Sequence, residues 1–419
     1  MGNEISRRAF LSSGVAVAAL GPAGCVSQSC IGGSLPPWRE GELDIHFIHT
    51  GVGEQTFFVF PDGTTMLLDC GDTHHANYMK EIPPRPDGTR YGGEWVSRYL
   101  QRVLPAGCRE IDYAMISHWH GDHTGDLAFG GKRTPDGRTV CGVPLVGEDF
   151  FFRHFLDHQY PKMGEHALDP DKGSLTLMRE WIPYACARGM KAHRLEPGAL
   201  NQIRLLHDAA RFPQFEIRNI AANGIVWDGA DGVIDAASTH IARTGKDSIH
   251  ENKLSSAIRI RYGRFSYYSG GDNEDNMVGA DGREFGWEGL IGRTTGPVDV
   301  CKTNHHAGIF GMRPEFVREV QAQTYLSSVW QARMVDHKSL SAMCSRELYS
   351  GGRIVCFGDI AESRRDVAEA YGSDIAPAGH AVVRVAPGGD TYRVFTLSAS
   401  DETMTVLFER SFRSRGGIV

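Results

Sequence analysis

The sequence lacks three features that would assign it to a familiar class: closely spaced cysteines, an excess of one charge, and a long apolar run. Its nine cysteines form no C-x-x-C pair, and the seven beyond residue 30 are scattered, which excludes a disulfide framework. The 44 basic and 51 acidic residues leave a net charge of -7, so no basic footprint for nucleic acid covers the whole surface, although a local basic groove would escape this sum. The 419 residues, 41% of them hydrophobic, suffice for one large domain or two modest ones.

Residues 1–40 are expected to be a signal peptide and a linker. Residues 6–11 read S-R-R-A-F-L, and the apolar run that continues to Ala23 is shorter than the roughly 20 residues that a bilayer span needs. The pattern resembles a twin-arginine export signal, which implies passage through the twin-arginine machinery to the periplasm. Cys25 follows a poor lipobox and is a candidate lipid anchor. The alternative is an ordinary N-terminus with a chance pair of arginines.

Short strand patterns alternate with helical patterns through residues 41–400. Apolar alternation bounded by Gly, Pro and Asp predicts strands at 43–48, 56–60, 65–71, 111–117, 215–220, 255–262, 265–268, 298–302, 380–385 and 392–395. Helical periodicity predicts helices at 93–103 and 313–323. This alternation favours one α/β layered domain.

Two further segments are expected to lie outside that regular pattern. Residues 132–198 are rich in His, Pro, Gly and aromatic residues, and we expect a long irregular insertion that shapes a substrate cleft. Residues 401–419 are expected to form a C-terminal tail.

A dense group of metal-binding residue types follows the apolar strand at 111–117. The residues after it are His118, Trp119, His120, Gly121, Asp122 and His123. In an extended segment His118 and His120 point the same way, because side chains repeat every two residues. The turn that follows brings the other two ligands beside them. Imidazole and carboxylate suit zinc, and they also suit Mn²⁺ or iron. The alternative is a polar loop without a metal.

The H-x-H-x-D-H pattern resembles that of the metallo-β-lactamase superfamily, and the chain looks most similar to the hydrolase domain of ComEC-like competence proteins. The segments at 68–71, 269–272 and 302–308 resemble further motifs of that domain, and the similarity covers roughly residues 42–400. The resemblance implies a four-layer αββα sandwich in which a pair of zinc ions activates water.

The resemblance also implies roles for two aspartates that end strands. Asp272 would be the carboxylate that bridges both metals, whereas its alternative is an ordinary turn residue. Asp69 would support the histidine segment without binding metal itself.

The resemblance leaves the roles of the remaining histidines open. One of His305 and His306 could bind metal, or they could assist the leaving group as general acids, in which case His337 would complete the second metal. His250 stands near the expected position of one more ligand, and its alternative is a solvated loop residue.

Metal-assisted hydrolysis is the expected activity, with Asp122 orienting or deprotonating the attacking water. The resemblance favours a phosphodiester substrate, either a small molecule or nucleic acid. One alternative is a β-lactam or lactone hydrolase of the same fold, and another is a zinc-binding protein without catalysis.

Overall fold

The computed structural model describes residues 29–74, 80–164, 170–245, 249–275, 277–278 and 284–416. The twin-arginine pattern and Cys25 lie outside the described residues. Within them, no helix combines the length and apolarity that crossing a membrane requires.

The first sheet has nine strands and joins the two ends of the chain. It is antiparallel from β21 to β3 and parallel from β3 to β8. In spatial order its strands are β21 (Val406–Arg413), β20 (Thr391–Leu397), β19 (His380–Val385), β1 (Leu43–Phe47), β2 (Thr56–Val59), β3 (Thr65–Leu68), β4 (Glu110–Met115), β7 (Phe151–Asp157) and β8 (Lys191–Arg194).

The second sheet has eight strands from the middle of the chain. Its strands from β13 to β18 run parallel, and the others pair antiparallel. In spatial order they are β11 (Val233–Asp235), β10 (Ile225–Trp227), β9 (Phe215–Ala222), β12 (Ala257–Tyr262), β13 (Phe265–Ser269), β16 (Val300–Lys302), β17 (Thr324–Ser327) and β18 (Ile354–Phe357).

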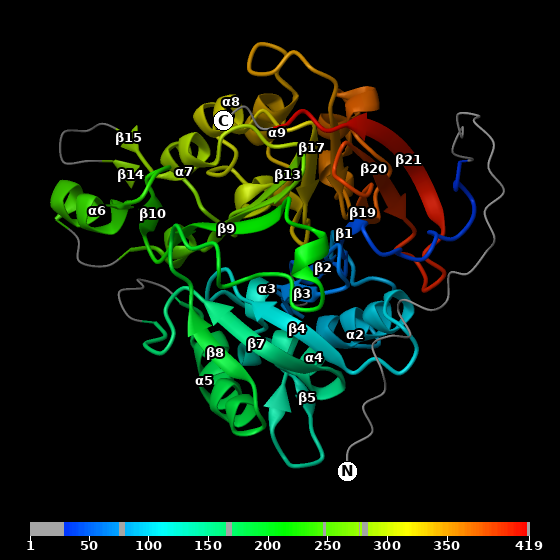
Figure 1. The fold of residues 1–419 in the computed structure, drawn as a ribbon, viewed down its shortest axis with the longest axis vertical. Helices are drawn as coiled ribbons and strands as arrows, with labels where there is room; N and C mark the ends of the chain where they lie inside the picture. The colour runs from blue at the N-terminus through cyan, green and yellow to red at the C-terminus, as the bar shows by residue number, and fades with distance from the viewer. Residues whose placement is uncertain are drawn as a thin grey trace.

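Helices cover the outer face of each sheet, and the two groups lie on opposite sides of the paired sheets (Figure 1). The first sheet is covered by α2 (Gly92–Val103), α4 (Gly142–Asp149) and α5 (Lys172–Ala187), and the second by α7 (Glu288–Thr295), α8 (Pro314–Val320) and α9 (His337–Cys344). The short elements are α3 (Gly121–Thr124), α6 (Ala236–Thr244), α10 (Arg365–Glu369), β5 (Lys132–Arg133), β6 (Thr139–Val140), β14 (Met277–Val278), β15 (Glu284–Phe285), η1 (Leu127–Phe129), η2 (Ala209–Arg211), η3 (Glu251–Leu254), η4 (Asn304–Ala307), η5 (Ala332–Met334), η6 (Glu362–Arg364) and η7 (Gly372–Asp374).

Three apolar layers hold this arrangement together. The central one lies between the sheets, where Phe58 of β2 meets Tyr267 of β13 with ring centroids 5.6 Å apart. The outer layers use amphipathic helices such as α2, whose Val96, Tyr99 and Leu100 are buried against the first sheet. The predicted four-layer αββα fold is therefore confirmed.

The prediction that residues 132–198 form an irregular insertion is wrong. This stretch contains α4, β7, α5 and β8, so it supplies strands and helices of the first half of the sandwich. Its regularity was hidden because Pro183 lies inside α5 and because Arg153 and His154 interrupt the apolar pattern of β7.

The prediction that residues 401–419 form a tail is also wrong, since β21 is the edge strand of the first sheet. Along β21 the charged Glu409 and Arg410 are half-buried and Arg413 is exposed, which weakens the apolar alternation. Residues before 41 also join this edge, because the Gly32 amide donates to the Val406 carbonyl at 2.9 Å. No disulfide joins the described cysteines to one another, and most of them are buried.

Truncation of a side chain in the layer between the sheets is expected to lower the stability of the fold strongly. Phe58→Ala is expected to lower the free energy of unfolding by about 3–5 kcal/mol, because it leaves a cavity against Tyr267. Leu407→Ala on the exposed face of β21 serves as the control and is expected to change it by no more than about 0.5 kcal/mol. Urea denaturation of the metal-free protein measures both, and equal midpoints for the two variants would contradict this packing.

Candidate metal centre

The candidate site lies where the two sheets meet at the carboxyl ends of their strands. Asp69 follows β3, the histidine segment follows β4, Asp272 follows β13 and His306 follows β16. The two sheets are joined there by the Ser256 amide, which donates to the Ser117 carbonyl at 2.9 Å. Strands that are far apart in the sequence therefore bring the polar residues that follow them to one place.

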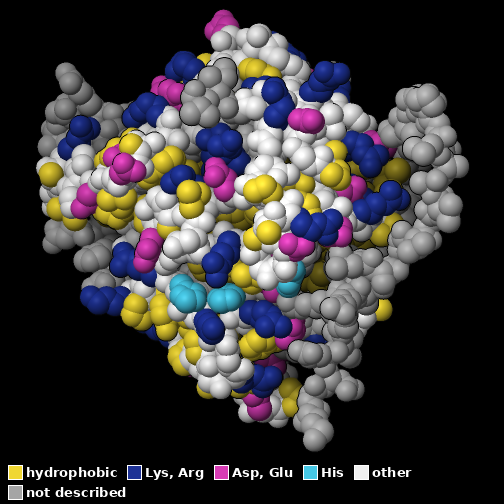
Figure 2. Space-filling view, in the orientation of Figure 1, with side chains coloured by type: hydrophobic (Ala, Val, Ile, Leu, Met, Phe, Trp, Pro, Cys, Tyr) yellow, Lys and Arg dark blue, Asp and Glu magenta, His cyan; other side chains and the backbone are white. Residues whose placement is uncertain are grey.

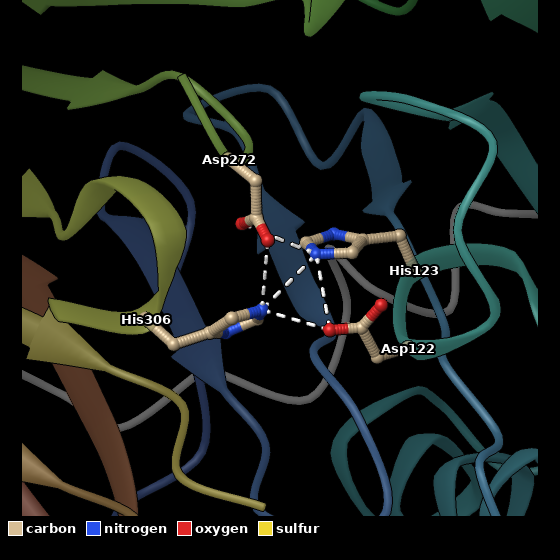
Figure 3. A group of neighbouring side chains, drawn as sticks. All are labelled: Asp122, His123, Asp272 and His306. Carbon is tan, nitrogen blue, oxygen red and sulfur yellow. Dashed lines mark hydrogen bonds and ion pairs between the residues drawn. The ribbon is translucent and has the colours of Figure 1, made fainter. Parts of the chain in front are cut away.

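Four side chains from three loops point toward a common centre (Figure 3). Asp122 and His123 come from α3, Asp272 from the loop after β13, and His306 from η4. The Nε2 atom of His306 lies 2.9 Å from Asp122 Oδ2 and 3.1 Å from Asp272 Oδ2. The Nε2 atom of His123 lies 3.2 Å from Asp272 Oδ1 and 3.2 Å from His306 Nε2. All four residues are buried, so they form one enclosed group.

His118 and His120 face the same way, as the spacing predicts. The Nε2 atom of His118 lies 3.1 Å from Nδ1 of His120, and the ring centroids of His118 and His123 are 4.2 Å apart. Both therefore lie beside the four-residue cluster. The sequence-predicted segment thus comes together as one group of ligand-type side chains, and Asp272 joins it from the other sheet.

His123 is oriented from behind by Asp69. The His123 Nδ1 atom lies 2.8 Å from Asp69 Oδ2, which leaves Nε2 directed into the centre. The same carboxylate accepts hydrogen bonds from the Ser117 amide and hydroxyl, both at 2.7 Å. Asp69 has a φ of 58°, a left-handed conformation that a non-glycine residue adopts only under restraint. This contact is the supporting role expected for Asp69.

His306 is oriented in the same manner by a residue that the sequence analysis missed. Its Nδ1 atom lies 3.2 Å from Oε2 of Glu54, and Glu54 Oε1 pairs with the Lys302 ammonium at 3.0 Å. Both partners are buried. Lys302 was visible in the 302–308 motif, but Glu54 is a lone acid in a glycine-containing loop before β2. No local pattern marks it.

Backbone contacts fix α3, which carries Asp122 and His123. The Asp122 carbonyl accepts the Glu54 amide at 2.8 Å, and the His123 carbonyl accepts the Cys70 amide at 2.8 Å. Gly71 is required at this junction, because a Cβ atom there would lie 1.9 Å from the Asp122 carbonyl oxygen. The loops before β2 and after β3 thus hold the ligand-bearing turn.

The turn that presents His306 is strained. His305, His306 and Ala307 have φ values of 48°, 52° and 56°, and each left-handed residue costs roughly 1–2 kcal/mol. The Ser327 hydroxyl donates to the His306 carbonyl at 3.0 Å, and the Gly308 amide donates to the His305 carbonyl at 2.7 Å. Such strain persists where surrounding contacts enforce it, and it is common at functional sites.

His305 points to a second group of polar side chains at the rim of the site. Its Nδ1 atom lies 2.9 Å from Glu274 Oε2, and Glu274 Oε1 pairs with the Lys253 ammonium at 3.0 Å. His250 lies nearby, 3.8 Å from Glu274 and with its ring centroid 6.0 Å from that of His120. His305 therefore stands apart from the four-residue cluster, and the role of His250 as a ligand stays a prediction.

The structure places His306, rather than His337, with the metal-type ligands. His337 is exposed at the first residue of α9 and belongs to neither group of described residues that could hold a metal ion. The two neighbouring histidines therefore lie in different places. His306 stands with the ligands, and His305 stands at the rim. The proposed metal role of His337 stays a prediction that no contact supports.

The opposite charges of the cluster stabilise one another. Burial disfavours protonation of His306, but Asp272 and Asp122 outweigh it and raise the pKa of His306 to about 10. Burial opposes protonation of His123 as well, yet the two carboxylates raise its pKa well above the usual value. Burial would raise the pKa of Asp272, but His306 and His123 lower it well below its usual value. Without a metal, two imidazolium groups therefore neutralise two carboxylates.

The donor atoms fit a tetrahedral cation. Ligands about 2.0–2.1 Å from a tetrahedral ion lie about 3.3 Å from one another. The separations among Asp122, His123, Asp272 and His306 are 2.9, 3.1, 3.2, 3.2 and 3.7 Å, with Asp272 turning Oδ2 to His306 and Oδ1 to His123, so the group surrounds a space of about that size. Two protonated ring nitrogens 3.2 Å apart cannot hydrogen bond to each other, so a shared cation explains their approach better than protons do.

The face of the molecule drawn in Figure 2 has mixed charge. On the face shown in Figure 2, the described Lys and Arg side chains are scattered among acidic and apolar ones without forming one continuous basic band. This face therefore agrees with the near-balanced composition of the chain.

No protein-family model matches the chain, and no curated protein matches it. Among solved structures, the short form of human tRNase Z is similar over 67% of this chain and 91% of that chain, with 12% sequence identity and a TM-score of 0.29. A likeness this distant does not align side chains, so the chemistry of the site depends on the contacts within this chain.

The raised pKa values of His306 and His123 predict that metal binding depends on pH. Each imidazole must lose its proton before the ring nitrogen binds a cation, so zinc affinity is expected to rise with pH up to about pH 10, where His306 loses its proton. Zinc binding at pH 7 should release protons. Calorimetric titration in buffers of different ionisation enthalpy measures that release.

His306→Gln is expected to reduce both the affinity and the number of protons released. His207→Gln, which alters a histidine paired with Asp112 outside the cluster, should leave both unchanged. Zinc binding that is independent of pH and releases no proton would contradict the charge assignment.

Proposed function

We propose that this protein is a metal-dependent hydrolase whose centre holds a pair of zinc ions. The observation that carries the proposal is the buried convergence of Asp122, His123, Asp272 and His306 beside the facing rings of His118 and His120. On this proposal the first four residues hold one ion. His118, His120 and the shared Asp272 hold the other.

Bound zinc would lower the pKa of a water molecule and stabilise the negative charge that develops during attack. The chain contributes position and charge. Asp69 and Glu54 direct the ring nitrogens of His123 and His306 into the centre. Asp122 places a carboxylate beside them that can orient the attacking water and accept its proton.

His305 is suited to assist the leaving group. Its side chain is 23% exposed, so it can reach a substrate, while His118, His123 and His306 are buried. Glu274 holds Nδ1 at 2.9 Å, which leaves Nε2 beside the Asn252 amide at 3.4 Å and near the rim. When both of its ring nitrogens carry a proton, an imidazole held in this way could donate the Nε2 proton to a departing oxygen.

A phosphodiester is the proposed substrate class. The support comes from the motif at 302–308, which resembles that of ComEC-like domains, together with the accessible His305 beside the metal cluster. Hydrolysis of a phosphodiester produces an alkoxide that needs a proton, and this need matches the placement of His305 at the rim.

Replacement of Asp122 tests the catalytic role most simply. Asp122→Asn is expected to lower kcat on bis-p-nitrophenyl phosphate by about 10²–10⁴-fold, because an amide cannot accept the proton of the attacking water. The far-UV circular dichroism spectrum should not change. Asp401→Asn is the matched control, because Asp401 is exposed and caps only the Thr403 amide and hydroxyl.

The substrate panel for this test includes nitrocefin and lactones. Turnover of nitrocefin or lactones alone would assign the protein to the alternative hydrolase class. A protein that binds zinc but hydrolyses nothing in the panel would be a binding protein, and full activity of Asp122→Asn would remove the proposed mechanism.

We also propose that the protein is exported by the twin-arginine route, on the pattern S-R-R-A-F-L at residues 6–11. A folded reporter fused after residue 40 is expected to leave the cytoplasm, and the double substitution Arg7→Lys with Arg8→Lys should block that passage. Cys25→Ser tests lipid anchoring by releasing a membrane-bound reporter. Equal export of the native and the doubly substituted signal would exclude the route.

A further inference from the structure

The backbone amides of Trp119 and Gly121, the residues on either side of His120, both donate to carboxylates from other parts of the chain. The Trp119 amide donates to Glu251 Oε1 at 2.8 Å, and the Gly121 amide donates to Asp171 Oδ2 at 2.8 Å. The Asp171 amide in turn donates to the Trp119 carbonyl at 3.1 Å. Neither carboxylate belongs to the groups that could hold a metal.

Glu251 reaches this position from the other sheet. It begins η3, which precedes β12, and it is fully buried. Its Oε1 atom also accepts from Nε2 of His158, at 3.0 Å. His158 follows β7, is itself fully buried, and lies against Trp119 with ring centroids 5.5 Å apart. Burying a carboxylate costs free energy unless its hydrogen bonds are satisfied. The segments of Trp119 and His158 supply the donors for Glu251.

The two halves of the metal centre are therefore braced in different ways. His123 and His306 are oriented through their own ring nitrogens, by Asp69 and Glu54. The segment carrying His118 and His120 is held through the peptide group that contains the amide of Trp119, the residue between them. In an extended segment the orientation of that peptide decides whether the side chains on its two sides converge.

We infer that Glu251, oriented by His158 and assisted by Asp171, is the positioning residue for the half of the metal centre formed by His118 and His120. This inference rests on the proposed function, since it assigns a role in metal binding. Loss of the Glu251 carboxylate would release the Trp119 amide, allow the two rings to diverge, and weaken one metal site. The site of Asp122, His123, Asp272 and His306 has separate braces and would remain.

The test is a zinc titration of the metal-free protein, with bound zinc also measured by elemental analysis. The native protein is expected to bind zinc in two steps. In Glu251→Gln one step should be unchanged and the other should lose about 10–100-fold in affinity. Asp171→Asn should shift the same step in the same direction. Cobalt substitution gives a second readout, because the visible bands of the affected site should weaken selectively.

Asp299→Asn is the matched control, because Asp299 is a buried carboxylate that accepts the Ser266 and Arg415 amides, both at 2.9 Å, and touches no metal-type ligand. It should leave both binding steps unchanged. If Glu251→Gln does not fold, His158→Gln provides the test, because it removes the group that orients Glu251 and keeps the carboxylate.

The inference would be overturned if folded Glu251→Gln kept the native affinity at both steps, and the same holds for His158→Gln where that variant provides the test. Equal weakening of both steps would also overturn it. A native protein that binds no zinc would instead contradict the proposed function itself, so the two failures can be told apart.

Discussion

The rest of the structure depends on the concentration of charge at the junction of two sheets. Asp122, His123, Asp272 and His306 are all buried, and their polar atoms lie within 4.8 Å of one another. Removing one ion from water costs several kcal/mol, so such a group persists only when each charge is compensated. The two imidazoles compensate the carboxylates by holding protons, and a divalent cation would do so with better geometry.

The scaffold is arranged to keep those groups in place. Carboxylates fix two of the rings from behind, and backbone hydrogen bonds from the loops before β2 and after β3 hold the α3 turn. Gly71 allows the close approach, and the left-handed turn at His305 and His306 directs one ring inward and the other toward the rim. Strain and tight contact at one place, supported by a well-packed sandwich, are the usual conditions for a preorganised site.

Local patterns in the sequence predicted the parts of the site that lie close together in the chain. The spacing of His118 and His120 is such a pattern, and the αββα fold followed from the resemblance that this motif carries. Glu54, Glu251 and Glu274 were missed, because each is a single acid brought to the site by tertiary contacts. The regular elements within 132–198 and 401–419 were also missed, because an internal proline in α5 and charged residues within β21 obscure their periodicity. The sequence alone could not show which of His306 and His337 lies among the metal-type ligands, because this depends on where the fold places each ring.

The central claim is that one cation is shared by ligands from both sheets. Anomalous X-ray diffraction at the zinc edge, from crystals of the zinc-loaded protein, tests it most directly. We predict a peak about 2.0–2.2 Å from Nε2 of His123, Nε2 of His306 and the facing oxygens of Asp122 and Asp272. Anomalous density that lies elsewhere, with these four side chains still hydrogen bonded to one another as described, would contradict the account.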